Sequence, residues 1–307
     1  MSSGLPDYAV ITPVRDEARN LPRTAASMVG QSERPARWLI VDDGSTDGTR
    51  ELAESLASEH DWIDVISAGP RTGTRARGGP IVRAFERGLG TLAEPPEVVV
   101  KMDADLELPP DCYERLLGLF AGDPRTGVAG ALVMNEIGGA LKGDVRPEFV
   151  HGALKAYRVT CLEGIGGLRA SMGWDGIDEY AARARGWRVA VLEDLVVVHF
   201  GRRGAKQPWH KARFEEGVAN HYMGYLFSFL ALRVVYRMAV ETPPVLGGLA
   251  IGAGFLHSRF TRLARVDDPL AIAQLRSEQR ERIRSLVRHP SPPNRWRGQP
   301  AVASRTE

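Results

Sequence analysis

The sequence predicts an α/β fold, in which helices flank a mainly parallel sheet and a helical appendage follows at the carboxyl end. Short apolar runs alternate with helical patterns through the first half of the 307 residues. Such alternation is typical of βαβ units. Beyond about residue 205 the chain is apolar and basic, and we expect this segment to be helical.

Four apolar runs in the first hundred residues are predicted strands, at residues 8–11, 38–41, 62–66 and 98–100. The first strand precedes a predicted helix that places Leu21, Ala25 and Met28 on one face. We expect that helix to end near Gly30. Together these segments predict consecutive strand–helix units.

Two further helices follow the second and third strands. The first of them uses Leu52 and Leu56 as buried positions, with Ser45 or Thr46 as its N-cap. The other has an apolar pattern made by Ile81, Val82, Phe85 and Leu89. Later strands are predicted at residues 128–134 and 189–200, with a helix at 175–185 between them.

The chain ends are expected to add little to the fold. Residues 1–6 are predicted to be flexible, and residues 289–307, rich in Pro, Arg and Ser, to be disordered. The first residues lack the basic and apolar pattern of a secretion signal. Residues 205–288 hold no window of about 20 apolar residues, the length that a membrane span requires. We therefore expect a cytoplasmic protein, or one held peripherally at the inner face of the cell membrane.

Composition and charge narrow the class of protein further. With 43% hydrophobic and 25% charged residues, the chain has the composition of a globular protein. Cys112 and Cys161 give neither a disulfide framework nor zinc spacing. Residues 1–200 carry 22 basic and 30 acidic side chains, whereas residues 201–307 carry 18 and 8. This asymmetry predicts an anionic partner, either a membrane surface or a phosphorylated substrate. We expect no nucleic acid, because the sequence lacks a recognised nucleic-acid-binding module.

Acidic side chains follow the predicted strand at 98–100. Asp103, Asp105 and Glu107 alternate along an extended segment, so their oxygens can converge on a hard cation such as Mg²⁺ or Mn²⁺. Open α/β sheets bind their ligands at this end of their strands. A solvated, acid-rich turn is the alternative for such a motif in isolation.

Polar residues also follow the first two strands. Asp42 and Asp43 precede a Gly-Ser-Thr turn, and residues 12–17 read Thr-Pro-Val-Arg-Asp-Glu. Three neighbouring strand ends would then present polar groups to one crevice. Helix capping is the alternative for the second motif, because Asp, Ser and Thr favour caps for local reasons.

In this order the three motifs resemble those of the family 2 glycosyltransferases, over about residues 7–200. One departure is Asp16, where that family commonly has asparagine. The resemblance implies the GT-A fold, which is Rossmann-like, a catalytic domain at 7–204 and a nucleoside diphosphate sugar donor. Around Asp103-Ala104-Asp105 the chain is also similar to dolichyl-phosphate mannose synthases.

The resemblance implies roles for individual residues. Asp43 matches the acid that bonds the nucleobase, Asp103 the residue near the ribose and metal, and Asp105 the direct ligand of Mn²⁺ or Mg²⁺. Glu107 and His199 match positions that can add metal contacts. The expected donor-binding residues are Thr12, Pro13, Arg15, Glu17, Asp42, Asp43, Arg75, Arg77 and Asp103. A histidine at a strand end also has structural uses, which leaves the role of His199 open.

Asp178 matches the general base of inverting members, with Ile177 where they often have glutamate. Asp175 and Glu179 are the alternative bases. An acceptor hydroxyl needs a nearby carboxylate to take its proton as it attacks the anomeric carbon. The alternative is that these acids only complement the positive end of a helix.

The sequence therefore predicts an inverting, metal-dependent glycosyltransferase. The acceptor would be a hydroxyl or phosphate on a polysaccharide, a glycolipid or a polyprenyl carrier. A sugar nucleotidyltransferase and a non-catalytic nucleotide-sugar-binding protein are the alternatives. The appendage at 205–288 could contact an anionic membrane surface, pack on the catalytic domain or form a homodimer.

Overall fold

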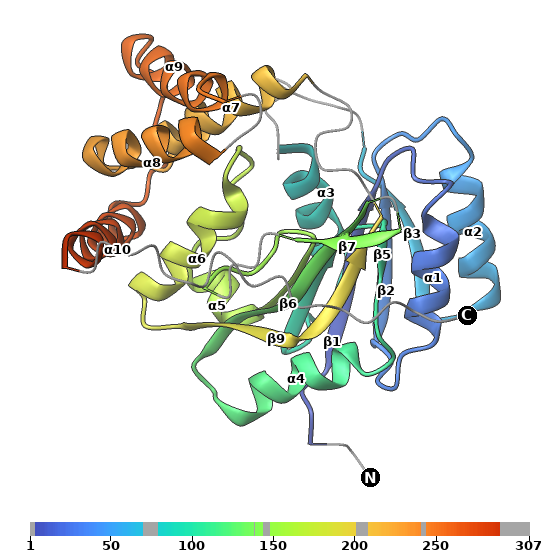
Figure 1. Cartoon of the computed structure of the whole chain (residues 1–307). Helices are drawn as coiled ribbons and strands as arrows, with labels where there is room; N and C mark the ends of the chain where they lie inside the picture. Colours follow the sequence, from blue (N-terminus) through green and yellow to red (C-terminus); the bar gives the residue numbers. More distant parts are fainter. Residues whose placement is uncertain are drawn as a thin grey trace.

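The computed structural model describes residues 4–69, 79–137, 139–143, 148–200, 208–240 and 244–288. In this part of the chain, helices cover both faces of a nine-stranded sheet (Figure 1). The strands are β1 (Tyr8–Val14), β2 (Arg37–Asp42), β3 (Ile63–Ser67), β4 (Val98–Met102), β5 (Leu106–Glu107), β6 (Thr126–Ile137), β7 (Ala140–Lys142), β8 (Leu154–Arg158) and β9 (Arg188–His199). The helices are α1 (Leu21–Val29), α2 (Thr49–Glu59), α3 (Gly79–Leu89), α4 (Cys112–Gly122), α5 (Val159–Gly164), α6 (Trp174–Ala184), α7 (Trp209–Tyr222), α8 (Phe227–Val240), α9 (Leu246–Phe260) and α10 (Pro269–Arg288).

The strand order is β3-β2-β1-β4-β8-β6-β9-β5, with β7 paired to β6 at the edge. The first four strands run parallel, β8 enters antiparallel between β4 and β6, and β6 and β9 are parallel again. The predicted fold class is confirmed: a mostly parallel sheet flanked by helices, with a helical region at the carboxyl end. Because β1, β2 and β4 are parallel, the residues that follow them meet at one edge of the sheet.

Strand alternation divides the core into two layers. Even-numbered residues such as Val10, Ile40 and Val100 pack with α1, α2 and α4 on one face of the sheet. Odd-numbered residues such as Ile11 and Val99 pack with α3, α5 and α6 on the other. Figure 1 shows α1 and α2 on the opposite side of the sheet from α5 and α6. The second layer therefore reaches the N-terminus of α6.

All six predicted strands are confirmed, and α1, α2, α3 and α6 appear where helices were expected. The prediction missed β5, β7, β8, α4 and α5. The sequence of β8 is Leu-Lys-Ala-Tyr-Arg, which does not read as an apolar run because Lys155 and Arg158 interrupt it. Both side chains are nevertheless buried in ion pairs.

The predicted cap of α2 is wrong. The helix begins at Thr49, and Gly48 is its N-cap with a φ of 92°. Ser45 and Thr46 instead bind the turn after β1, where the Ser45 hydroxyl accepts from the Asp16 backbone at 3.1 Å. The predicted burial of Leu52 is also wrong, since its exposed fraction is 38%.

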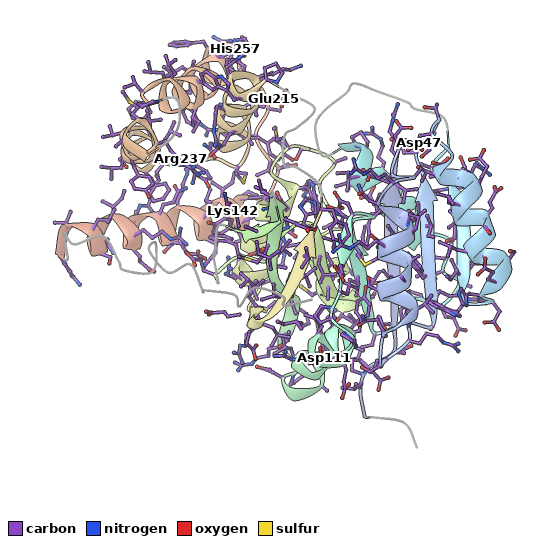
Figure 2. The ribbon with its side chains drawn as sticks, turned by 45° about the vertical axis from the view of Figure 1, so that its right-hand side comes forward. Asp47, Asp111, Lys142, Glu215, Arg237 and His257 are labelled. Atoms are coloured by element: carbon purple, nitrogen blue, oxygen red, sulfur yellow. The ribbon has the colours of Figure 1, made fainter. Side chains whose placement is uncertain are left out.

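Helices α7 to α10 form the region after the sheet. The backbones of α7 and α9 lie so close that a Cβ on Gly217 would stand 2.0 Å from the carbonyl oxygen of Ile251. In Figure 2, Glu215, Arg237 and His257 mark this group of helices, on the far side of the sheet from Asp47. Among the described helices, none is both long and apolar enough to cross a membrane.

Helix α10 connects this region to the sheet domain. Ala271 and Leu275 belong to the core layer that α6 covers. Asp268 lies 3.1 Å from Arg185 just after α6, an ion pair across the same boundary. The boundary predicted at residue 205 therefore separates two parts that share one apolar core.

Candidate metal centre and its surroundings

Asp103, Asp105 and His199 form a cluster at the edge where β4 and β9 end. Strand β5 pairs antiparallel with β9, which brings Leu106 opposite His199 and places Asp105 beside the imidazole. Their candidate ligand atoms all lie within 4.8 Å of one another. The His199 Nε2 atom is 3.1 Å from Asp105 Oδ2. These three residues, predicted separately from the sequence, therefore come together.

Asn135 orients the imidazole. Its Oδ1 lies 2.9 Å from His199 Nδ1, and the two residues are opposite each other in the β6–β9 register. Because an amide oxygen only accepts, Nδ1 donates to Asn135, and Nε2 is the ring nitrogen that faces the Asp105 carboxylate. Two acceptors 3.1 Å apart repel unless a cation or a proton lies between them.

The donor set fits a divalent cation. Two carboxylates and a neutral imidazole suit Mn²⁺ better than Mg²⁺, which prefers oxygen ligands and water. A second hydrogen bond that fixes the ligating histidine is a common feature of protein metal sites. Asn135 was not predicted, because no pattern in its own segment indicates that β6 will pair with β9.

Lys101 binds and orients Asp103. Its ammonium group donates to Asp103 Oδ1 and, at 2.7 Å, to the carbonyl oxygen of Gly152. Burial raises the pKa of Asp103, with a further contribution from the Asp105 charge, while Lys101 opposes both. The role of Lys101 could have been predicted from the sequence, because it is the one charged residue within β4 and precedes Asp103 by two positions.

Glu107 lies outside the cluster. Its carboxylate pairs with Arg23, which also contacts Glu136 at 3.2 Å. The Arg23 guanidinium stacks on the ring of Phe200, 3.7 Å from the ring centroid. The metal contact expected of Glu107 stays a prediction, and it would compete with this ion pair.

Asp178 is buried and fully engaged. Its two oxygens accept from Lys155 Nζ at 3.0 and 2.8 Å, and one of them also accepts from the Tyr157 hydroxyl at 2.5 Å. Its exposed fraction is 3%. A carboxylate that already binds a buried ammonium and a phenol is poorly placed to take a proton from a substrate.

Glu179 is equally occupied. It is fully buried, and its oxygens accept from the Val150 backbone at 3.0 Å, from Lys155 at 2.9 Å and from Arg183 at 3.1 Å. Burial raises its pKa to about 7, with Lys155 acting against that rise and Asp178 adding to it. Glu179 is therefore a buried residue that holds Val150, Lys155 and Arg183 in place.

Asp175 differs from the other two acids. It lies in the first turn of α6 and is partly exposed. Its side chain makes no hydrogen bond within the described part of the chain. A Cβ on Gly152 would stand 2.9 Å from its Oδ2, so the carboxylate lies against the same segment that Lys101 holds. Of the three candidate bases, Asp175 is the one open to a substrate.

Two buried lysines face each other beside this site. Lys101 and Lys155 are partners in the antiparallel β4–β8 register. Both ammonium groups lie over the Trp174 ring, 5.5 and 5.9 Å from its centroid. Like charges opposite one another destabilise a sheet, so the pair depends on Asp103 and on the acids of α6 for compensation.

The predicted nucleotide residues lie at the ends of β1 and β2. Asp43 is mostly buried, with Arg15 Nη1 3.8 Å from its carboxylate. Burial raises the pKa of Asp43, and Arg15 and Arg83 act against that rise while Asp42 adds to it. Arg83, on α3, was not predicted and is a further cation that acts on Asp43.

Other predicted nucleotide residues have structural contacts. The Thr12 hydroxyl is buried and accepts from the Trp38 indole at 2.9 Å. Asp42 accepts from the Ser45 backbone at 3.0 Å, and the Glu17 backbone donates to the Thr49 hydroxyl at 2.8 Å. Pro13 is half-buried within β1. Arg75 and Arg77 lie outside the described residues.

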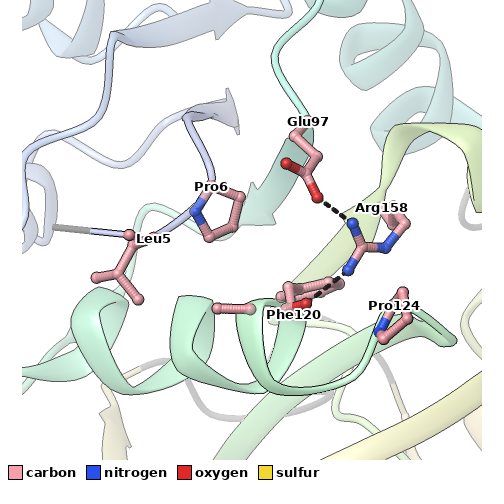
Figure 3. Close-up of a pocket in the computed structure, with 8 residues that line it drawn as sticks. Leu5, Pro6, Glu97, Phe120, Pro124 and Arg158 are labelled. Carbon is pink, nitrogen blue, oxygen red and sulfur yellow. Dashed lines mark hydrogen bonds and ion pairs between the residues drawn. The ribbon is translucent and has the colours of Figure 1, made fainter. Parts of the chain in front are cut away.

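The pocket drawn in Figure 3 is at the other end of the sheet. It measures about 360 Å³ and is lined by residues that precede β1 and β4, among them Pro6 and Glu97. Arg158 in its wall donates to the backbone oxygens of Thr126 and Phe120 and pairs with Glu97. These contacts satisfy the guanidinium. The pocket is separate from the candidate metal centre, because it lies at the opposite ends of the strands.

Comparison with curated proteins finds similarity to sugar-transferring enzymes over part of their length. The chain is 32% identical over 78 residues to glycosyltransferase AglE of Haloferax volcanii, 25% of this chain and 26% of that protein. It is 31% identical over 114 residues to the dolichol-phosphate mannosyltransferase of Saccharomyces cerevisiae, 36% and 39% of the two chains. It is 36% identical over 109 residues to the polyprenol monophosphomannose synthase of Mycolicibacterium smegmatis, 35% and 38% of the two chains. The matched stretches thus span about a quarter to two fifths of these relatives.

Structural similarity extends further along the chain. The mannosyltransferase PcManGT from Pyrobaculum calidifontis, solved in complex with GDP-Man and Mn²⁺, superposes with a TM-score of 0.55 at 19% identity, covering 93% of this chain and 82% of that chain. This likeness confirms the expected GT-A fold. The model of the family described as "Glycosyl transferase family 2" matches residues 9–162, half of the sequence. The chain therefore belongs to glycosyl transferase family 2.

Proposed function

We propose that the chain is an inverting glycosyltransferase that moves a sugar from a nucleoside diphosphate sugar to the phosphate of a polyprenyl phosphate. The observation that carries this proposal is the cluster of Asp103, Asp105 and His199 at the carboxyl ends of the strands. It lies at the edge of the sheet that also carries Asp43. The matched relatives that act on dolichol or polyprenol phosphates support the same reaction class.

Asp103, Asp105 and His199 would hold the divalent cation, Mn²⁺ or Mg²⁺. When bound there, the ion supplies positive charge that stabilises the departing diphosphate. Lys101 fixes one oxygen of Asp103, and Asn135 fixes the imidazole. Ligand atoms held in this way need little rearrangement when charge develops on the leaving group.

Asp43 would accept hydrogen bonds from the N–H groups of the donor nucleobase. It is mostly buried beside Arg15, and the cations Arg15 and Arg83 favour its ionised form. Thr12 and Asp42 would act indirectly, because their side chains stabilise the strand end and turn that carry Asp43.

The occupied state of Asp178 and Glu179 favours a phosphate acceptor. A phosphate monoester has a second pKa of about 6 and is mostly ionised at neutral pH, so it needs no base before it attacks the anomeric carbon. A hydroxyl acceptor does need one. Since Lys155 binds both acids, neither is suited to that task.

A hydroxyl acceptor is the second candidate, supported by the carboxylate of Asp175. It is partly exposed and makes no hydrogen bond within the described residues. In that reaction Asp175 would take the proton of the acceptor hydroxyl. The two candidates therefore differ in whether transfer depends on Asp175.

The test compares two acceptors of equal chain length, a polyprenyl phosphate and the corresponding polyprenol. Purified protein would receive Mn²⁺ and GDP-mannose, then UDP- and dTDP-sugars in turn, and the products would be identified by mass spectrometry. We expect transfer to the phosphate alone, inverted anomeric configuration, and retained activity in Asp175→Asn. Transfer to the polyprenol that Asp175→Asn abolishes would establish the second candidate instead. Donor binding without any transfer would indicate a non-catalytic nucleotide-sugar-binding protein.

A further inference from the structure

Helix α8 exposes an unbroken apolar row. The side chains of Phe227 and Val235 are 67% and 66% exposed, and Leu232 and Tyr236 are about half exposed beside them. Ala231, midway between Phe227 and Val235, is also exposed, so this row repeats every four residues along the helix. The arginines of α8 are only partly exposed, and Arg233 pairs with Glu216 of α7. The outer face of α8 therefore carries no exposed charge.

Helix α9 exposes a second row. Leu246, Leu249, Leu256 and Phe260 are exposed, at spacings that follow one face of a helix. Phe260 is 80% exposed, the largest value among the exposed hydrophobic side chains of the described residues. The opposite side of α9 packs on α8, where a Cβ on Gly248 would stand 2.5 Å from Met238 Cγ. The two rows therefore belong to one packed pair of helices.

This exposure is concentrated in one region. Of the 18 large hydrophobic side chains that are exposed in the described part of the chain, 11 lie between residues 209 and 263. Contiguous apolar patches on soluble proteins are usually small, and larger ones mark contact with a partner or a membrane. The outer faces of α8 and α9 thus need an apolar covering.

The charge around these helices indicates what covers them. Residues 246–266, which hold α9 and the segment after it, contain three arginines and no acid, and Asp267 and Asp268 follow. Arg259, Arg262 and Arg265 are all exposed at and just beyond the end of α9. A symmetric dimer through this face would bring like-charged arginines together, whereas anionic lipid headgroups would attract them. An apolar face bordered by arginines is typical of helices that lie in the plane of a membrane.

We propose that the outer faces of α8 and α9, together with Arg259, Arg262 and Arg265, are the surface by which the protein inserts into a monolayer of anionic lipids. This inference deepens the proposed function, because a polyprenyl phosphate acceptor resides in a membrane. The surface would place the protein flat against the bilayer, with no helix crossing it.

The experiment measures binding of the full chain to vesicles that contain neither donor nor polyprenyl phosphate. Sedimentation would compare phosphatidylglycerol–phosphatidylcholine vesicles with phosphatidylcholine alone. We expect about tenfold tighter binding to the anionic vesicles, since each basic residue at an anionic surface adds to the attraction. The double variant Val235→Asp/Phe260→Asp should weaken that binding by about tenfold or more, because both side chains would otherwise be buried in lipid.

Val29→Asp on α1 is the matched control, since Val29 is 45% exposed on the sheet domain, and it should bind vesicles like the unchanged protein. Arg259→Glu/Arg262→Glu should remove the preference for anionic vesicles while leaving the fold intact. Vesicle binding that is absent, or unchanged in Val235→Asp/Phe260→Asp, would overturn the proposal. So would a dimer in sedimentation velocity that this variant dissociates and that binds no lipid.

Calorimetry of GDP-mannose binding with Mn²⁺ on the same samples separates this proposal from the proposed function. Donor binding should be equal in the unchanged protein and in Val235→Asp/Phe260→Asp, because α8 and α9 pack mainly on each other and on α7 and α10, not on the strands that carry the metal cluster. Vesicle binding without donor binding would contradict the proposed function alone. Donor binding without vesicle binding would contradict the surface alone.

Discussion

The contact between Asp105 and His199 requires a metal ion or a proton between the two side chains. With Nδ1 of the imidazole bonded to Asn135, Nε2 faces Asp105 Oδ2 at 3.1 Å. Lys101 neutralises the neighbouring Asp103, so it leaves the Asp105 charge for another cation. A divalent cation held by Asp103, Asp105 and His199 would supply the charge that this contact needs.

Replacing Asp105 with asparagine should remove metal-dependent donor binding. The substitution keeps the shape and removes the charge that a divalent cation requires, so Mn²⁺ should no longer increase the affinity for GDP-mannose by a measurable factor in calorimetry. Asp64→Asn, at a half-exposed position on β3, is the matched control and should bind donor like the unchanged protein. Equal enhancement by Mn²⁺ in both variants would contradict the metal site.

Replacing Asp178 with asparagine should act mainly on stability. The change leaves the buried Lys155 ammonium with one partner fewer, and breaking a buried pair costs about 3 kcal/mol or more of unfolding free energy. Asp194→Asn breaks the exposed pair with Arg115, which should cost less than about 0.5 kcal/mol. Urea denaturation measures both. A stable Asp178→Asn protein without transfer activity would instead support the catalytic role expected from the resemblance.

At the scale of elements, the turns after β1 and β2 form one unit. Asp16 has a φ of 53°, a left-handed conformation that Asp and Asn tolerate better than other side chains. Its carboxylate accepts from the Thr46 backbone at 2.9 Å, which ties the two turns together. The sequence departure at this position is therefore conservative, because aspartate meets the same backbone requirement as asparagine.

Helices α7 and α9 should separate more easily in acid. His221 on α7 is buried against the Phe255 ring of α9, at 5.5 Å between ring centroids. Burial lowers its pKa below the usual 6.5, and Arg265 and Arg259 lower it further. Below about pH 6.5 the unfolded chain therefore binds more protons than the folded one, so stability falls as the pH falls.

Thermal unfolding between pH 5 and 8 measures this effect. His221→Phe should lose less stability than the unchanged protein as the pH is lowered from 7 to 5. His210→Phe, at an exposed position on the same helix, is the matched control and should keep the original pH dependence. Parallel pH profiles for His221→Phe and the unchanged protein would contradict this account.

The elements that the sequence predicted are those whose signal is local. In apolar runs such as Val98–Met102 and amphipathic segments such as Trp174–Ala184, the local sequence pattern alone predicts the secondary structure. Strand β8 could not be found in this way, because Lys155 is buried only through acids that α6 supplies. Asn135 depends in the same way on the pairing of β6 with β9. Strand β8 and the role of Asn135 were missed because both depend on contacts between segments that are distant in the sequence.

The position of Asp178 shows the same limit for the site. Its general-base role is an expectation from the family resemblance, which places a carboxylate near the start of this helix. The sequence alone carries no sign that Lys155 and Tyr157 will face it. Asp103 and Asp105 were predictable because they directly follow a buried strand.

The sheet domain and the carboxyl-terminal helices should unfold as one. Leu275 of α10 is fully buried in the core layer that also contains Ile11 and Val99. Leu275→Ala should therefore lower the unfolding free energy by about 3 kcal/mol, through lost burial and the cavity that remains. Leu270→Ala, on the same helix but 57% exposed, should change it by less than about 0.5 kcal/mol. Hydrogen exchange measured by mass spectrometry should show faster exchange in peptides from β1 and β4 as well as from α10 in Leu275→Ala, because one shared core ties their opening together. Faster exchange confined to α7–α10 would mean that these helices form a separate unit, and the catalytic domain could then be studied without them.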